Sequence, residues 1–135
     1  MSVSTKTEYA LRALLEIPDK SSISAQSICD KQNLPKKYTE QLLRSLKKAG
    51  LVVSSPGALG GYTLARPASR ITLLDIMDAV EDRNAEMNCA RDKQFCLGDD
   101  CGLQAVFNEL AKKQRGLFRG YSLANIIKDL KQEKQ

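Results

Sequence analysis

Apolar residues recur at three- and four-residue steps along most of this chain, which is the spacing of an amphipathic helix. The pattern predicts helices near residues 5–17, 24–32, 35–50 and 72–80, then a long helix from 103 and a last one from 122. Between residues 51 and 66 two short β-prone runs flank a Pro/Gly cluster, which predicts a hairpin. The expected fold is therefore mainly α with a small β wing.

The predicted helix at 35–50 has one apolar side and one basic side. Its apolar side carries Tyr38, Leu42, Leu46 and Ala49, while its polar side carries Lys36, Lys37, Glu40, Gln41, Arg44, Lys47 and Lys48. Pro35 suits a first turn and Gly50 a C-terminal cap. A helix, a short turn, a basic helix and a hairpin, in this order, predict a winged helix-turn-helix.

The charge balance favours DNA as the partner of this basic face. The chain has 21 Lys and Arg against 16 Asp and Glu, a net charge of +5, and a solvated basic face is the plainer alternative. In the major groove, Gln41 could pair with adenine, Glu40 could accept from cytosine, and Arg44 could bind guanine or phosphate. The predicted DNA contacts are Lys36, Lys37, Tyr38, Glu40, Gln41, Arg44, Gly60 and Gly61.

Composition excludes several other classes of protein. No apolar run approaches the roughly 20 residues of a membrane span, and the first residues lack a signal-peptide core, so we expect a cytoplasmic protein without membrane contact. The sequence has no histidine. This excludes Ser-His and Cys-His catalysis and any histidine metal ligand, so no enzymatic activity is predicted.

Three of the four cysteines lie within thirteen residues of a polar segment, at Cys89, Cys96 and Cys101. This clustering indicates a shared ligand. Gaps of six and four residues match neither common zinc spacing nor common ferredoxin spacing, so zinc, an iron-sulfur cluster and a thiol switch all remain open. Cys29 lies far away on an apolar stripe and is interpreted as a core residue.

Two helix starts carry capping-box patterns, Thr5-x-x-Glu8 and Thr72 with Asp75. The helix from 103 carries an apolar stripe outside the winged-helix core, and Ser122 resembles the N-cap of the last helix. Such a stripe needs a partner, and a two-fold dimer helix is favoured. The stripe consists of Val106, Phe107, Leu110, Leu117 and Phe118.

The chain therefore divides into three parts. We expect residues 1–82 to form the winged helix-turn-helix DNA-binding domain, 83–102 a cysteine-rich ligand-binding loop, and 103–135 the dimerisation helix and C-terminal helix. A homodimer would read a pseudo-palindromic operator in double-stranded DNA, with half-sites about 34 to 36 Å apart.

Three stretches resemble the Rrf2 family of bacterial regulators, of the IscR, NsrR and CymR type: residues 4–14, Tyr38-Thr39-Glu40-Gln41-Leu42-Leu43, and the 57–65 segment around Gly60-Gly61-Tyr62. The resemblance implies base reading at the positions of Lys37, Glu40 and Gln41, and dimerisation through the long helix. Several members carry a minor-groove arginine where this chain has Pro56. The glycines of the wing, Gly57, Gly60 and Gly61, are expected to allow positive φ in the turn.

Cluster-binding members of that family carry three cysteines at this place, so the resemblance implies an iron-sulfur cluster on Cys89, Cys96 and Cys101. A histidine of the IscR subgroup corresponds to Gln104 here. Glu8 is then the best fourth ligand, supplied across the dimer, with Asp99 and Asp100 as local rivals. Glu8 also has structural roles available, capping Thr5 or pairing with Arg12. A 4Fe-4S cluster is favoured modestly over 2Fe-2S.

The leading hypothesis is a homodimeric transcriptional repressor whose operator binding depends on a cluster that senses nitric oxide, redox state or iron-sulfur status. The alternative is a cluster-free regulator of the same fold, controlled by thiol oxidation or a partner protein. A small redox or cluster-carrier protein is the weakest hypothesis, because it leaves the helix-turn-helix and the wing unexplained.

Overall fold

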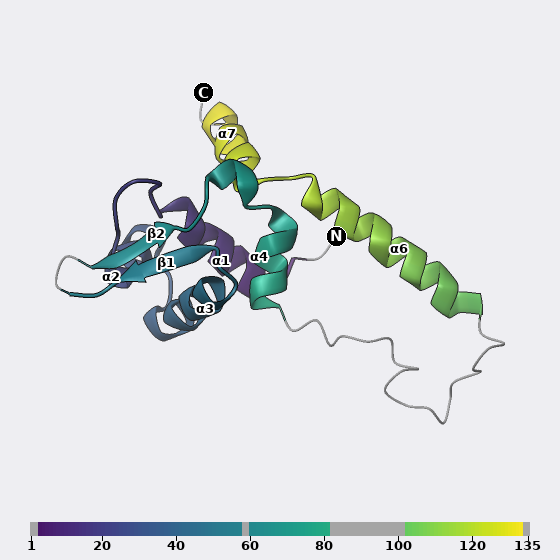
Figure 1. The fold of residues 1–135 in the computed structure, drawn as a ribbon, viewed down its shortest axis with the longest axis horizontal. Helices are drawn as coiled ribbons and strands as arrows, with labels where there is room; N and C mark the ends of the chain where they lie inside the picture. The colour runs from purple at the N-terminus through teal and green to yellow at the C-terminus, as the bar shows by residue number, and fades with distance from the viewer. Residues whose placement is uncertain (1–2, 58–59, 82–101, 134–135) are drawn as a thin grey trace.

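The computed structural model describes residues 3–57, 60–81 and 102–133. Most of the predicted cysteine-rich loop, including Cys89, Cys96 and Cys101, lies outside this part of the chain. The fold is mainly helical with one two-stranded sheet, as predicted (Figure 1). Its elements are α1 (Thr5–Leu15), α2 (Ala25–Gln32), α3 (Lys36–Lys48), β1 (Val52–Ser55), β2 (Gly61–Leu64), the 3-10 helix η1 (Ala68–Arg70), α4 (Leu73–Val80), α6 (Gly102–Arg119) and α7 (Leu123–Glu133).

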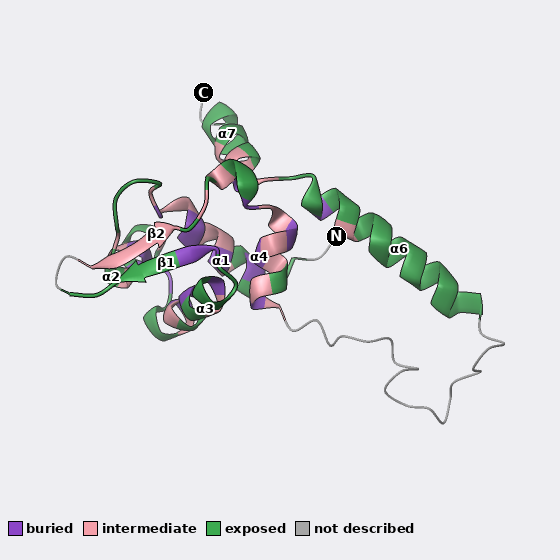
Figure 2. Ribbon diagram, viewed as in Figure 1, coloured by how far each residue is buried: buried purple, intermediate pink, exposed green. Residues whose placement is uncertain are grey.

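The core lies where α1, α2, α3 and α4 pack together, with β1 closing one side. Its fully buried members include Leu14, Ile28, Leu43, Leu46, Leu51, Ile71 and Ile76. Helix α6 projects from this domain, and Figure 2 shows that nearly its whole length is exposed. The winged domain thus has a core of its own, whereas α6 has none.

The start of α1 differs from the prediction. Ser4, not Thr5, is the N-cap, and its hydroxyl accepts a hydrogen bond from the Thr7 amide at 3.2 Å. The capping-box prediction for Thr5 and Glu8 is therefore wrong, because moving the cap by one residue puts Thr7 in the third helical position. Thr7 is buried, and its hydroxyl donates to the Glu81 carboxylate at 2.7 Å.

Two other caps confirm the sequence analysis. At the start of α4, the Thr72 hydroxyl accepts from the Asp75 amide at 3.0 Å, and the Asp75 carboxylate accepts from the Thr72 amide at 2.9 Å. At the start of α7, the Ser122 hydroxyl accepts from the Asn125 amide at 3.1 Å. These local bonds satisfy amides that the first turn of a helix leaves without partners.

Strands β1 and β2 form the predicted antiparallel hairpin, with Ser55 opposite Gly61. The hairpin is attached to the segment before α2, because Tyr62 and Ile23 exchange two backbone hydrogen bonds of 3.0 and 2.7 Å. The wing therefore has a fixed base beside the helix-turn-helix.

Helices α6 and α7 meet the winged domain at a narrow junction. The Leu73 amide donates to the Tyr121 carbonyl at 2.8 Å, and the Leu123 amide donates to the Ile71 carbonyl at 2.7 Å. Leu123 is fully buried, and Phe118 is only 8% exposed. Phe118 was predicted to belong to the exposed stripe of α6. It instead packs on its own chain, because it lies in the last turn, where α6 meets the domain.

Candidate nucleic-acid interface

A tight turn separates α2 from α3. Asn33 adopts a left-handed conformation with φ 52°, and the Leu34 amide donates back to the Cys29 carbonyl at 3.0 Å. Leu34 and Cys29 are 7% and 4% exposed, so both belong to the core, as predicted for Cys29. Pro35 is the N-cap of α3, one position before the first turn that the sequence suggested. This geometry is that of a helix-turn-helix, with α3 as its second helix.

Helix α3 presents a basic outer face. Its inward residues Thr39, Leu42, Leu43 and Leu46 are buried. Of the predicted DNA contacts on α3, Tyr38 and Glu40 are half-buried, and the fully exposed ones are Lys36, Lys37, Gln41 and Arg44. Ala49, predicted on the apolar side, is exposed because it is the C-cap, where the chain leaves the helical path.

The charges on this face are free to meet another molecule. Lys36, Lys37, Arg44, Lys47 and Lys48 form no ion pair with another residue that the structure describes. A cation without an internal partner keeps its full charge for a phosphate and releases counterions when it binds one. The polar groups of Glu40 and Gln41 lie among these cations, where base edges would be read in a major groove.

Two residues of α1 contact α3 and the end of α2, next to the turn. Neither was among the predicted DNA contacts. The ring of Tyr9 contacts the ring of Tyr38 in the first turn of α3, with centroids 5.7 Å apart. The Arg12 guanidinium lies 5.5 Å from the Tyr9 ring centroid and donates to the backbone carbonyl of Gln32 at the end of α2. The position of Tyr9 on the apolar face of α1 was the available sequence signal. No sequence signal indicated that Arg12 would bond to Gln32, twenty residues away.

The glycines of the wing have two different roles. Gly57 has φ +98°, which a residue with a side chain rarely adopts, so the predicted positive φ is confirmed there. At Gly60 and Gly61 the predicted positive φ is wrong. A Cβ on Gly60 would lie 2.1 Å from the Ser55 carbonyl oxygen, and one on Gly61 would lie 2.3 Å from the Ile23 carbonyl oxygen. Close backbone approach requires glycine at these two positions.

Glu8 lies on the outer side of the first turns of α1. Its side chain is 59% exposed and its carboxylate is 3.8 Å from the Arg12 guanidinium, the ion pair that the sequence allowed. In residues 3–57, 60–81 and 102–133, no three His, Cys, Asp or Glu side chains are grouped to hold a metal. The predicted cysteine ligands fall outside these ranges.

Among the helices that the structure describes, none is both long enough and apolar enough to cross a bilayer.

Sequence relatives of the chain are bacterial regulators. It is 32% identical over 133 residues to the protein rrf2 of Nitratidesulfovibrio vulgaris, covering 96% of this chain and 89% of that protein. It is 30% identical over 133 residues to the HTH-type transcriptional regulator IscR of Xenorhabdus nematophila, covering 96% and 80%. These relatives are regulators rather than enzymes, in agreement with the prediction of a non-enzymatic protein.

The chain also resembles solved structures of bacterial regulators. The T. potens IscR structure matches with a TM-score of 0.75 and 30% identity, over 100% of this chain and 92% of that one. CymR, the global cysteine regulator of B. subtilis, matches with a TM-score of 0.74 and 26% identity, over 95% and 97%. The Rrf2 family, described as an iron-dependent transcriptional regulator, matches residues 3–129. With its helix-turn-helix, its wing and these relatives, the chain belongs to the Rrf2 family of DNA-binding transcriptional regulators.

Proposed function

We propose that this protein is a homodimeric repressor whose binding to a pseudo-palindromic operator is controlled by an iron-sulfur cluster. The cluster would sense nitric oxide, redox state or iron-sulfur status. The observation that carries the DNA-binding part is the outer face of α3, whose five cations have no ion-pair partner among the described residues. Lys36, Lys37, Tyr38, Glu40, Gln41 and Arg44 are the proposed contacts on α3, with the backbone of Gly60 and Gly61 at the wing.

The proposed dimer is supported by α6. This helix exposes large apolar side chains at Leu103, Val106, Phe107, Leu110 and Leu117, each between 47% and 75% exposed. At 100° per residue these positions fall on one side of the helix. A contiguous apolar stripe in water is typical of an association surface. A second copy related by a two-fold axis would cover it and would place two α3 helices on one face of the DNA.

The dimer can be tested by changing one residue of the stripe. Leu110→Glu places a charge in the proposed interface, so sedimentation should show monomers at concentrations where the unaltered protein is dimeric. Lys112→Gln is the matched control, because Lys112 lies on the opposite side of α6 and is 76% exposed. A dimer that persists with Leu110→Glu would contradict the assignment of this interface.

The cluster proposal depends on whether the chain's donors suit the group. With no histidine in the sequence and Cys29 buried in the core, the available soft ligands are the thiols of Cys89, Cys96 and Cys101. Glu8 is accessible, and its ion pair with Arg12 is long and partly solvent-exposed, so its carboxylate can be withdrawn from Arg12 at small cost. Three thiolates and one carboxylate are an acceptable donor set for an iron-sulfur cluster, with 4Fe-4S favoured modestly over 2Fe-2S.

When bound, the cluster would supply a redox-active group whose carboxylate-held iron is open to nitric oxide or oxygen. Within the chain, the ion pair of Glu8 with Arg12 would transmit the loss of the cluster to the helix-turn-helix. A Glu8 that serves as a ligand leaves Arg12, and a Glu8 that is released returns to it. Since Arg12 and its neighbour Tyr9 contact both helices of the helix-turn-helix, this exchange can alter the setting of α3. A coupling of about 1 to 3 kcal/mol is typical of such regulation.

The experiment is iron and acid-labile sulfide analysis of protein purified without oxygen, together with operator binding. We expect about four irons per chain for a 4Fe-4S cluster. Cys96→Ser should lose the iron, whereas Cys29→Ala should keep it while lowering stability. Iron that is absent from the unaltered protein after reconstitution would contradict the cluster and leave DNA binding in place. Glu8→Ala with unchanged iron would remove Glu8 from the ligand set.

One observation favours a second candidate, a regulator of the same fold controlled by thiol oxidation or by a partner protein. The position where the IscR subgroup carries a histidine is Gln104, an exposed residue in the first turn of α6, and glutamine is a poor iron ligand. Mass mapping of oxidised protein distinguishes the two. A specific disulfide between two of Cys89, Cys96 and Cys101 supports a thiol switch, and its absence from protein that holds iron supports the cluster.

A further inference from the structure

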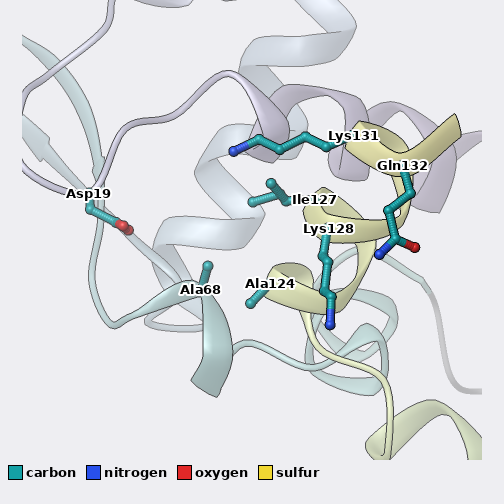
Figure 3. Close-up of a pocket in the computed structure, with 7 residues that line it drawn as sticks. All are labelled: Asp19, Ala68, Ala124, Ile127, Lys128, Lys131 and Gln132. Atoms are coloured by element: carbon teal, nitrogen blue, oxygen red, sulfur yellow. The ribbon is translucent and has the colours of Figure 1, made fainter. Parts of the chain in front are cut away.

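A cavity of about 460 Å³ lies on the side of α7 that faces the winged domain (Figure 3). Its walls come from three separate parts of the chain. Asp19 belongs to the connection between α1 and α2, Ala68 to η1, and the remaining wall to the outer turns of α7. The volume is within the range of small-molecule sites, about 300 to 1,000 Å³.

The floor of this cavity is apolar. It is made by Ala68, Ala124 and Ile127, and both Ala68 and Ile127 contact the hydrophobic core. On the other side of Ile127 lies a second cavity, of about 220 Å³. Helix α7 has a single buried residue in its described length, Leu123. Both hollows are open to solvent, so the inner face of α7 leaves apolar surface that another molecule can cover.

The rim of the cavity carries more positive than negative charge. Lys128 and Lys131 both line it, and Figure 3 shows the Lys131 side chain extended over Ile127 toward the Asp19 side. Neither lysine forms an ion pair with another described residue, and Asp19 is the one acidic side chain in the lining. A net charge of +5 on the whole chain adds to the attraction for an anion.

We propose that this cavity binds a small organic anion, a carboxylate with a short apolar body. The apolar part would cover Ala68, Ala124 and Ile127, while the carboxylate would meet the ammonium group of Lys131, which extends over Ile127 (Figure 3). Such a ligand contacts α7 and the winged domain together. Its binding therefore stabilises the junction between the DNA-binding domain and the C-terminal helices, independently of any cluster on the cysteines.

The test uses hexanoate as the probe, followed in amide NMR spectra of the full chain. Hexanoate should shift the amides of Ala68, Ala124 and Ile127 in a saturable manner, with a Kd on the order of 1 mM or tighter. Three compounds separate the contributions: hexan-1-ol has the apolar body without charge, hexylamine has the opposite charge, and acetate has the charge without the body. Each should bind at least several-fold more weakly than hexanoate.

Two variants locate the site. Lys131→Gln removes one ammonium group and should raise the Kd of hexanoate several-fold, and Ala124→Leu should abolish binding by filling the floor. Lys6→Gln is the matched control, an exposed lysine on α1 away from this cavity that should leave the Kd unchanged. Hexanoate that causes no saturable shift, or equal binding of hexan-1-ol or hexylamine, would overturn the proposal. So would an unchanged Kd in Lys131→Gln.

Discussion

The ring of Tyr9 lies edge-on to the ring of Tyr38, with centroids 5.7 Å apart and an interplanar angle of 76°. Tyr9 is in α1 and Tyr38 is in the first turn of α3, so the pair joins α1 to the N-terminal end of α3. Edge-to-face aromatic pairs contribute about 0.5 to 1.5 kcal/mol beyond the area they bury. This contact sets where the first turn of α3 lies.

Replacing Tyr9 should therefore affect both stability and DNA binding. We expect Tyr9→Ala to lower the free energy of unfolding by about 1 to 3 kcal/mol, since it removes a half-buried ring and its aromatic contact. Operator affinity should fall further than the loss of folded protein explains. Urea titration and fluorescence anisotropy measure the two effects. Tyr9→Phe keeps the ring and should stay close to the unaltered protein. If Tyr9→Ala binds the operator normally when folded, the ring does not position α3.

Arg12 should be as important as Tyr9, for a different reason. Its guanidinium donates to the Gln32 carbonyl and contacts the face of the Tyr9 ring, so it satisfies a carbonyl at the C-terminal end of α2. Losing this charged hydrogen bond should cost about 1.5 to 3 kcal/mol of unfolding free energy in Arg12→Ala. Arg12→Lys should not restore it, because an ammonium group lacks the planar fork that serves both contacts.

The control for Arg12 is Lys6→Ala, which removes an exposed cation from the same helix and should change stability by less than about 0.5 kcal/mol. Equal unfolding free energies for Arg12→Ala and Lys6→Ala would contradict the role given to the Gln32 bond.

The contacts of Tyr9 and Arg12 show which part of the interface the sequence could not predict. The faces of α3, the hairpin and the caps at Thr72 and Ser122 depend on residues a few positions apart, so local periodicity and capping patterns predicted them. The contact between Arg12 and Gln32 joins residues twenty positions apart. It depends on the angle at which α1 crosses α2, which no local pattern encodes.

The wrong predictions also concern contacts between residues that are distant in the sequence. Ser4 and Thr5 are both N-cap residue types, and only Thr5 has a glutamate three positions later. The hydrogen bonds of Ser4 and Thr7 to Glu81, of 2.5 and 2.7 Å, are distant interactions associated with the cap at Ser4. Gly61 was interpreted as a turn glycine because the sequence does not reveal that Ile23 runs beside it. Phe118 fits the stripe of α6 by period, but its burial depends on where α6 leaves the domain.

Three glycines should respond differently to the same substitution. Gly61→Ala would place a Cβ 2.3 Å from the Ile23 carbonyl oxygen, so it should cost about 1 to 3 kcal/mol or more of unfolding free energy. Gly57→Ala should cost about 1 to 2 kcal/mol, because φ is +98°. Gly116→Ala, in the last turn of α6, where the new Cβ would have no atom within 4 Å apart from its neighbours in the same helix, should stabilise by about 0.5 to 1 kcal/mol. Urea unfolding of the three variants measures these changes. A neutral Gly61→Ala would contradict the close approach of the wing to Ile23.

Residues on the outer face of α3 are expected to contribute differently to DNA affinity and to sequence selectivity. Lys47 lies in the last turn of α3, where it can meet phosphate alone, so Lys47→Ala should weaken binding to all sequences alike and reduce the salt dependence by about one unit of slope. Gln41 lies in the N-terminal half of α3 and is a proposed base contact, so Gln41→Ala should cost about 1 to 3 kcal/mol on the operator and little on unrelated DNA. Titrations of both variants against operator and scrambled DNA at several salt concentrations measure this. The assignment of α3 as the reading helix predicts opposite patterns for the two variants. If Gln41→Ala weakens binding to operator and scrambled DNA equally, the preference for the operator is unchanged and Gln41 does not read a base.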